Sequence, residues 1–183
     1  MLVERDAPVS ADRLVAPRIE AEVAFVLGAD LDSGPLNAEQ VRTSVAYAVA
    51  ALEIVDSRIA GWDITFGDTV ADNASSAMFV LGTERRSLTE FTPVEAEMTM
   101  AINGEEVSTG TGAACLGDPL EALRWLATTA RDLGQPLRAG QIVLSGALGP
   151  MRPVTAGDIV TATITGLGTV GVTFIGTPTG DHA

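Results

Sequence analysis

The segment from Arg18 to Leu31, RIEAEVAFVLGADL, constrains the fold most, because its side chains alternate between two faces that are both largely apolar. This period of two is the pattern of a β-strand. One face would carry Ile19, Ala21, Val23, Phe25 and Leu27, and the other Glu20, Glu22, Ala24 and Val26. Since both faces are apolar beyond the acids, we expect a strand that is covered on both sides.

Glu20 and Glu22 would leave this strand from the same face, with Cα atoms roughly 6.5–7 Å apart. Two like charges so close on a partly buried face require neutralising arginines, a divalent cation or a solvent-exposed strand edge. Mg²⁺ would fit, because it accepts carboxylate oxygens and keeps several water positions open for a substrate. The spacing alone does not choose among these explanations, and an exposed strand face is the commonest of them.

Residues 37–58 change to a helical period. Asn37 can cap a helix, Gln40 stands at the capping-box position, and Val41, Val45, Val49 and Leu52 follow helical spacing. Glu53 continues the apolar series and is the third acid of interest, because a carboxylate there could complete a site for a hard cation. Two alternatives remain open. Glu53 could form an ion pair with Arg18 or Arg58, and Asp56 and Arg58 could simply terminate and cap this helix.

The remaining segments indicate a single β-dominated domain. Residues 1–17 are polar, contain Pro8 and Pro17, and are interpreted as an N-terminal arm before a domain that spans 18–183. Strands are expected over 74–82, in a hairpin that turns at Asn103-Gly104, and in the glycine-rich last third. A second helix opens at Asp118-Pro119 and closes at Gly134. We therefore predict an α+β fold with a mixed sheet or roll and two main helices.

Composition excludes several classes of function. The net charge of −13 opposes a nucleic-acid or anionic-membrane partner, and all 11 basic residues are arginine, so Schiff-base and Walker-type lysine chemistry is excluded. One cysteine, Cys115, and one histidine, His182, leave little for zinc sites or nucleophilic triads. There is no apolar run that could span a bilayer and no basic leader, so the expected location is the cytoplasm. Chemistry here must use carboxylates, hydroxyls, arginines, backbone amides or a hard metal ion.

Six segments resemble one family in order and spacing: PRIEAEVAFVLGADL, ALEIVDSRI, DTVADNASSAMFVLG, CLGDPLEALRWLA, LRAGQIVLSGALGPM and AGDIVTATITGLGTVGVTF. The chain is similar over Pro17 to Phe174 to the 2-keto-4-pentenoate (2-hydroxypenta-2,4-dienoate) hydratases of the fumarylacetoacetate hydrolase superfamily. This resemblance implies the fold of that superfamily's C-terminal part. It also implies metal ligands at Glu20 and Glu22 on a strand and at Glu53 on the following helix, with Mg²⁺ or Mn²⁺ as the ion.

The same resemblance implies a reaction. The ion would chelate the 1-carboxylate and 2-oxygen of 2-hydroxypenta-2,4-dienoate while water adds to the alkene to give 4-hydroxy-2-oxopentanoate. Asn73, Ser75 and Ser145 would line the substrate site. Such enzymes act in aromatic meta-cleavage catabolism as homo-oligomers, so the expected partners are a small 2-oxo or 2-hydroxy acid and further copies of the chain.

Two departures from the family pattern leave alternatives. Gly117-Asp118-Pro119 stands where the family has G-H-P, and aspartate is a good helix cap. Family members also begin several dozen residues earlier, with a lysine credited with proton transfer, and this chain has no lysine. The alternatives are a 2-oxo-3-enedioate (4-oxalocrotonate-type) decarboxylase, or a catalytically silent subunit that binds a metal or a paralogue.

Overall fold

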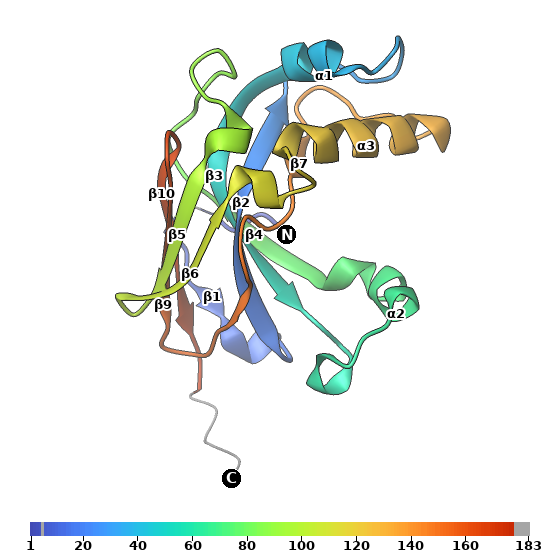
Figure 1. Cartoon of the computed structure of the whole chain (residues 1–183). Helices are drawn as coiled ribbons and strands as arrows, with labels where there is room; N and C mark the ends of the chain where they lie inside the picture. Colours follow the sequence, from blue (N-terminus) through green and yellow to red (C-terminus); the bar gives the residue numbers. More distant parts are fainter. Residues whose placement is uncertain (5, 178–183) are drawn as a thin grey trace.

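The computed structural model describes residues 1–4 and 6–177, and His182 lies outside that range (Figure 1). The strands are β1 Val9–Ser10, β2 Pro17–Leu27, β3 Val45–Asp56, β4 Ser76–Leu81, β5 Glu97–Ile102, β6 Glu105–Thr111, β7 Ile142–Leu144, β8 Arg152–Pro153, β9 Ile159–Ile164 and β10 Gly168–Ile175. The α-helices are α1 Ala38–Ser44, α2 Phe66–Ala71 and α3 Pro119–Asp132. Single 3-10 turns lie at Ala11–Arg13, Ala60–Trp62, Asn73–Ser75, Pro93–Glu95 and Gly112–Ala114. The predicted α+β, strand-dominated fold is confirmed.

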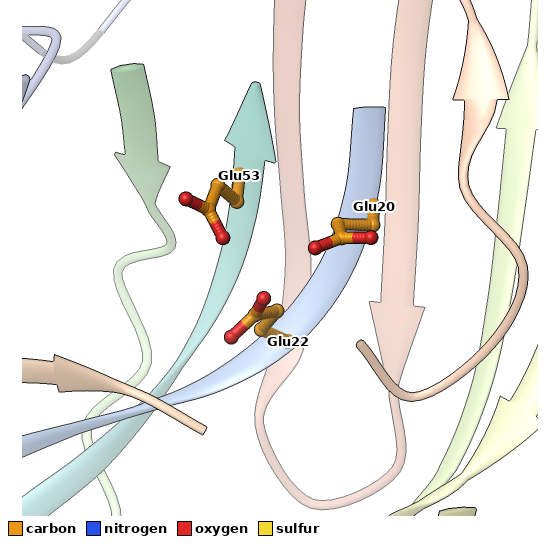
Figure 2. A group of neighbouring side chains, drawn as sticks. All are labelled: Glu20, Glu22 and Glu53. Atoms are coloured by element: carbon orange, nitrogen blue, oxygen red, sulfur yellow. The ribbon is translucent and has the colours of Figure 1, made fainter. Parts of the chain in front are cut away.

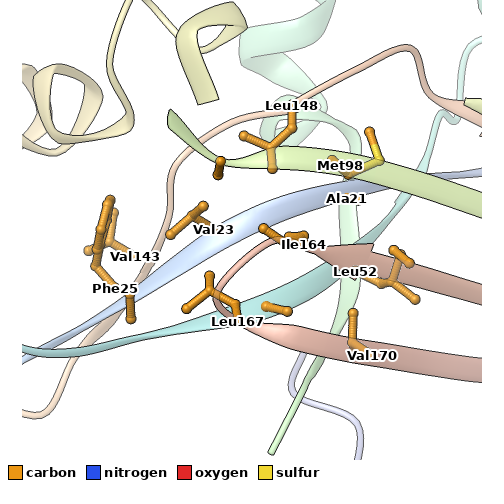
Figure 3. Packing of buried hydrophobic residues seen from close by; sticks show 14 of the residues in the cluster. Ala21, Val23, Phe25, Leu52, Met98, Val143, Leu148, Ile164, Leu167 and Val170 are labelled. Atoms are coloured by element: carbon orange, nitrogen blue, oxygen red, sulfur yellow. The ribbon is translucent and has the colours of Figure 1, made fainter. Parts of the chain in front are cut away.

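The strands form two sheets that enclose the core. One sheet has the order β4-β3-β2-β7, with β8 also paired to β2, and the other has the order β1-β10-β9-β5-β6. Figure 3 shows side chains of both sheets meeting between them, among them Val23 and Leu52 of the first sheet and Ile164 and Val170 of the second. Burying these apolar side chains away from water is the main force that holds the sheets together.

The strand predicted around Glu20 is confirmed as β2. Its core face buries Ile19, Ala21, Val23 and Phe25 at 0% exposure. Its opposite face is also covered beyond the acids, because Ala24 packs there with Val49 and Ala51 of β3 in a second apolar cluster. β2 is therefore central to its sheet and buried on both sides, and the glutamates stand on the face turned away from the core.

The helix predicted over residues 37–58 is wrong after Ser44. Asn37 caps α1 as expected, with its side chain accepting a hydrogen bond from Gln40 N, but the chain then enters the 12-residue strand β3. β3 is paired on both edges, with β2 and with β4, and those neighbours satisfy its backbone groups. Its valines and isoleucine suit such a buried strand, and this tertiary setting overrides a helical period. Glu53 thus lies on a strand and not on a helix.

Asp56 does not cap a helix. It ends β3, and its carboxylate accepts hydrogen bonds from the backbone amides of Val15, at 3.0 Å, and Ala16, at 2.7 Å. Other residues of the predicted arm pair with both sheets: Val3 N donates to Phe79 O of β4, and β1 runs parallel to β10. The boundary between arm and domain at residue 17 stays a prediction.

The helix predicted at Asp118-Pro119 is confirmed as α3. Asp118 accepts a hydrogen bond from Leu120 N at 2.9 Å, and Gly134, with φ of 76°, follows the helix end. Leu123 and Ala127 on its inner side are fully buried. α3 contacts α1, and the two lie together at one end of the sheets (Figure 1). No helix of the described chain is both long and apolar enough to cross a membrane.

Candidate metal centre

Three glutamates meet on the outer face of the β2–β3 pair. Glu20 of β2 stands directly opposite Glu53 of β3, and Glu22 is the next residue of β2 on the same face. Figure 2 shows the three side chains converging, and one carboxylate oxygen from each lies within 4.8 Å of the others. We call this group the glutamate triad.

The triad is costly without a cation. Burial and the nearby charge of Glu53 raise the pKa of Glu20 to about 7. Glu22 is only 1% exposed, and burial, followed by the charge of Glu53, raises its pKa well above the usual range. Both shifts mean that the protein disfavours several negative charges at this point, and a divalent cation would reverse that preference.

Arginine does not supply the missing positive charge. None of the ion pairs found in the described part of the chain includes a triad residue. Arg18 lies over the Trp62 ring, 4.5 Å from its centroid, and Arg58 pairs with Asp72. The interpretation of Glu53 as an ion-pair partner of either arginine is therefore wrong, and the donor set of three carboxylates fits a hard divalent ion.

Two hydrogen bonds hold the triad. Gly146 N donates to Glu22 Oε2 at 2.6 Å, and the Ser76 hydroxyl donates to Glu53 Oε1 at 2.8 Å. Gly146 follows the end of β7 and has φ of 105°, a conformation that favours glycine. Ser76 begins β4, the strand that pairs with β3 on the side away from β2. One donor therefore comes from β4 and the other from the segment that follows β7, on opposite sides of the β2–β3 pair.

A cavity of about 400 Å³ opens above the triad. Ala122, Trp125 and Leu126 of α3 form one wall, and Val143 and Leu144 form part of another. Besides the triad, the polar side chains that line it are Ser76 and Ser145. Within the described residues its lining contains no basic side chain. The cavity therefore combines an acidic floor with largely apolar walls.

The three predicted substrate-lining residues are placed differently. Ser145 lines the cavity, and its hydroxyl donates to Gly146 O. Ser75 is 2% exposed and donates to Asp72 Oδ2 at 3.0 Å, and Asn73 is exposed on the preceding turn; neither lines the cavity. Their roles stay predictions.

Sequence reasoning passed over Ser76 as a site residue. It adjoins Ser75, but Ser75 ends the 3-10 turn Asn73–Ser75 and Ser76 begins β4. A bulge in the β3–β4 pairing lets Ser76 share the face of Glu53 and line the cavity, and strand alternation along β4 does not indicate this.

Known proteins are similar to this chain in sequence and fold. The 2-keto-4-pentenoate hydratase of Burkholderia vietnamiensis is 52% identical over 120 residues, covering 66% of this chain and 46% of the relative. That of Paraburkholderia xenovorans is 53% identical over 113 residues, covering 62% and 42%. The chain thus spans about half the length of the curated relatives it matches. The solved 4-oxalocrotonate decarboxylase from Pseudomonas putida, complexed with magnesium and adipate, is 35% identical with a TM-score of 0.87, covering 91% of this chain and 64% of that one.

A family model extends the match to nearly all of the described residues. The model for the fumarylacetoacetate hydrolase C-terminal family matches residues 2–175, from before β1 to the end of β10. That range contains the glutamate triad and every wall of the cavity above it. The chain therefore belongs to the fumarylacetoacetate hydrolase C-terminal family.

Proposed function

We propose that this chain carries the metal and substrate site of a hydratase that converts 2-hydroxypenta-2,4-dienoate to 4-hydroxy-2-oxopentanoate in aromatic meta-cleavage catabolism. The observation that carries this proposal is the glutamate triad on the floor of a cavity with largely apolar walls. The relatives named as 2-keto-4-pentenoate hydratases support it. This chain spans about half the length of those relatives. The hydratase activity of the whole protein is therefore a proposal.

Glu20, Glu22 and Glu53 would hold Mg²⁺ or Mn²⁺. When bound, such an ion attracts the carboxylate and 2-oxygen of the substrate and stabilises negative charge that develops there. The chain's own residues would then orient the rest of the molecule. Ser76 and Ser145 offer hydroxyl groups beside the triad, and Trp125 and Leu126 offer an apolar surface for a short hydrocarbon tail.

The cavity lining favours a substrate with one carboxylate. A second carboxylate, as in an oxalocrotonate, would face apolar walls, and an unpaired buried charge is strongly disfavoured. A vinyl tail matches those walls without any charged partner. The described lining of this cavity, with no arginine in it, thus favours the dienoate hydratase over the decarboxylase.

The decarboxylase remains the second candidate. It is favoured by the close similarity to the solved 4-oxalocrotonate decarboxylase, whose structure contains the dicarboxylate adipate. Product analysis separates the two reactions, because only the decarboxylase releases CO₂ while only the hydratase adds water across the alkene.

The test is turnover of the dienoate by purified, Mg²⁺-loaded protein. We expect its ultraviolet absorbance to disappear and 4-hydroxy-2-oxopentanoate to accumulate, and we expect Glu53→Gln to abolish both metal retention and turnover. Glu97→Gln, an exposed glutamate on β5, is the matched control. If the parent retains metal but leaves the dienoate unchanged, the hypothesis of a catalytically silent subunit gains support. Such a subunit would bind metal and assemble with a paralogue, and co-purification of the two chains would reveal the assembly.

Several features stay predictions from the sequence and its resemblance. These are the cytoplasmic location, the homo-oligomeric state, the use of Mn²⁺ in place of Mg²⁺, and the absence of nucleic-acid and membrane partners. A small-acid substrate agrees with the named relatives and with the size of the cavity above the triad.

A further inference from the structure

Two of the three triad carboxylates each have one oxygen engaged by the protein. Gly146 N donates to Glu22 Oε2 and Ser76 Oγ donates to Glu53 Oε1, so each side chain keeps one oxygen for another partner. We propose that these two donors make the site selective for Mg²⁺ over Ca²⁺, with Ser76 as a positioning residue. This inference rests on the metal centre of the proposed function and adds what determines its choice of ion.

The selectivity follows from the ligand demands of the two ions. Ca²⁺ takes about six to eight oxygens at about 2.3–2.6 Å and often binds a carboxylate through both oxygens. Mg²⁺ takes six at about 2.0–2.1 Å in near-octahedral geometry and keeps several water positions. Two carboxylates that each keep one oxygen for the ion suit Mg²⁺ and leave positions for a chelating substrate. They offer Ca²⁺ fewer bidentate contacts, and therefore fewer carboxylate oxygens, than it often takes.

The donor to Glu22 is itself held in place. Ser145 N donates to Val23 O and Leu148 N donates to Ala21 O, so the segment around Gly146 is fastened to β2 on both sides of Glu22. The Cys115 thiol donates to Ser145 O at 2.7 Å, and this carbonyl belongs to the same peptide group as Gly146 N. A Cβ on Gly146 would lie 3.2 Å from Cys115 Sγ, which shows how closely the two segments pack.

The donor to Glu53 is held by its strand. Ser76 is the first residue of β4 and stands opposite Val55 of β3, two residues along from Glu53 on the same face. Its hydroxyl lines the cavity and comes from β4, whereas the carboxylate that it contacts belongs to Glu53 of β3. Removing this hydroxyl would free Glu53 to turn both oxygens toward an ion without removing any ligand.

The experiment measures affinities for Mg²⁺ and Ca²⁺ on the metal-free full chain, by competition with Mn²⁺ followed by electron paramagnetic resonance. In the parent we expect Mg²⁺ to bind more tightly than Ca²⁺. In Ser76→Ala we expect the ratio of the Ca²⁺ Kd to the Mg²⁺ Kd to fall by roughly 10-fold, the lower end of what loss of a group behind a metal ligand costs. Ser76→Thr, which keeps the hydroxyl, should restore the parent ratio.

Ser108→Ala is the matched control, because this buried serine donates to Pro150 O and lies on β6 of the other sheet. Its ratio should equal that of the parent. Cys115→Ala is an independent variant, because it removes the thiol that holds the peptide group donating to Glu22. It should also lower the ratio of the Ca²⁺ Kd to the Mg²⁺ Kd. Cys115→Ser should give a ratio closer to that of the parent.

The outcomes are distinguishable. If the parent binds Mg²⁺ and the ratio is unchanged in both Ser76→Ala and Cys115→Ala, the selectivity proposal is overturned and the metal centre stands. If the parent binds neither ion, the metal centre and the selectivity proposal both fail. Turnover is not part of this readout, so the choice between hydratase and decarboxylase does not affect it.

Discussion

The raised pKa of Glu20 predicts that the metal-free protein loses stability as the pH rises, and that Glu20→Gln removes much of this loss. Below pH 4.5 this carboxyl is protonated in the folded and the unfolded chain alike. As the pH rises from 4.5 to about 7, the unfolded chain ionises while the folded chain retains its proton. The free energy of unfolding therefore falls through this range and reaches its full loss above the folded pKa.

The magnitude follows from the size of the pKa change. At about 1.4 kcal/mol for each pKa unit, a change from 4.5 to about 7 corresponds to about 3 kcal/mol. That is a large part of the roughly 5–15 kcal/mol by which a folded domain is stable. A neutral glutamine at position 20 keeps the shape of the side chain and cannot ionise.

The assay is urea unfolding followed by circular dichroism at pH 5, 6, 7 and 8 in the presence of a chelator. Parent, Glu20→Gln and Glu105→Gln are compared, and the last removes one charge at an exposed position on β6. Glu20→Gln should be more stable than the parent at pH 8 by about 2–3 kcal/mol and nearly equal to it at pH 5. Equal pH slopes in the parent and Glu20→Gln would refute the reasoning, since burial of an ionisable group at this site would then cost nothing.

Three further predictions concern the ligands, the core and the helix. Glu22→Gln should weaken Mg²⁺ binding by more than about 10-fold, because it removes a charged ligand, and calorimetric titration that found parent affinity would exclude Glu22 as one. Phe25→Ala, at a position with 0% exposure between the sheets, should lower the free energy of unfolding by about 3–5 kcal/mol in urea titrations. Asp118→Ala should cost about 1 kcal/mol through loss of the cap on Leu120 N, whereas Asp132→Ala at the exposed far end of α3 should cost less.

The strand and the second helix were predictable because local signals agreed with the final setting. Alternation in RIEAEVAFVL gave β2, and the aspartate, proline and glycine around residues 118–134 gave α3. The Asn103-Gly104 turn was equally direct, since both residues have positive φ, which this turn type requires. In each case the local sequence pattern is enough to indicate the structure of the segment.

The segment after Ser44 was not predictable in this way, yet the face on which Glu53 lies was. Val49 and Glu53 are four residues apart, and four is close to the helical period as well as a multiple of the strand period. Either structure therefore places Glu53 on the same face as Val49, and only pairing with β2 and β4 decides between them. The donors Ser76 and Gly146 depend on contacts between distant segments, which no local period reports.

The direct pairing of Glu20 with Glu53 ties ion binding to the alignment of two strands. A slip of β2 by one residue would turn Glu20 and Glu22 toward the core and bring Ile19 and Ala21 outward. Without an ion, repulsion between the charges of Glu20 and Glu53 would destabilise the correct alignment. Stoichiometric uptake of Mg²⁺ by a refolded sample would therefore report that β2 and β3 are in register, which bulk secondary-structure content does not distinguish.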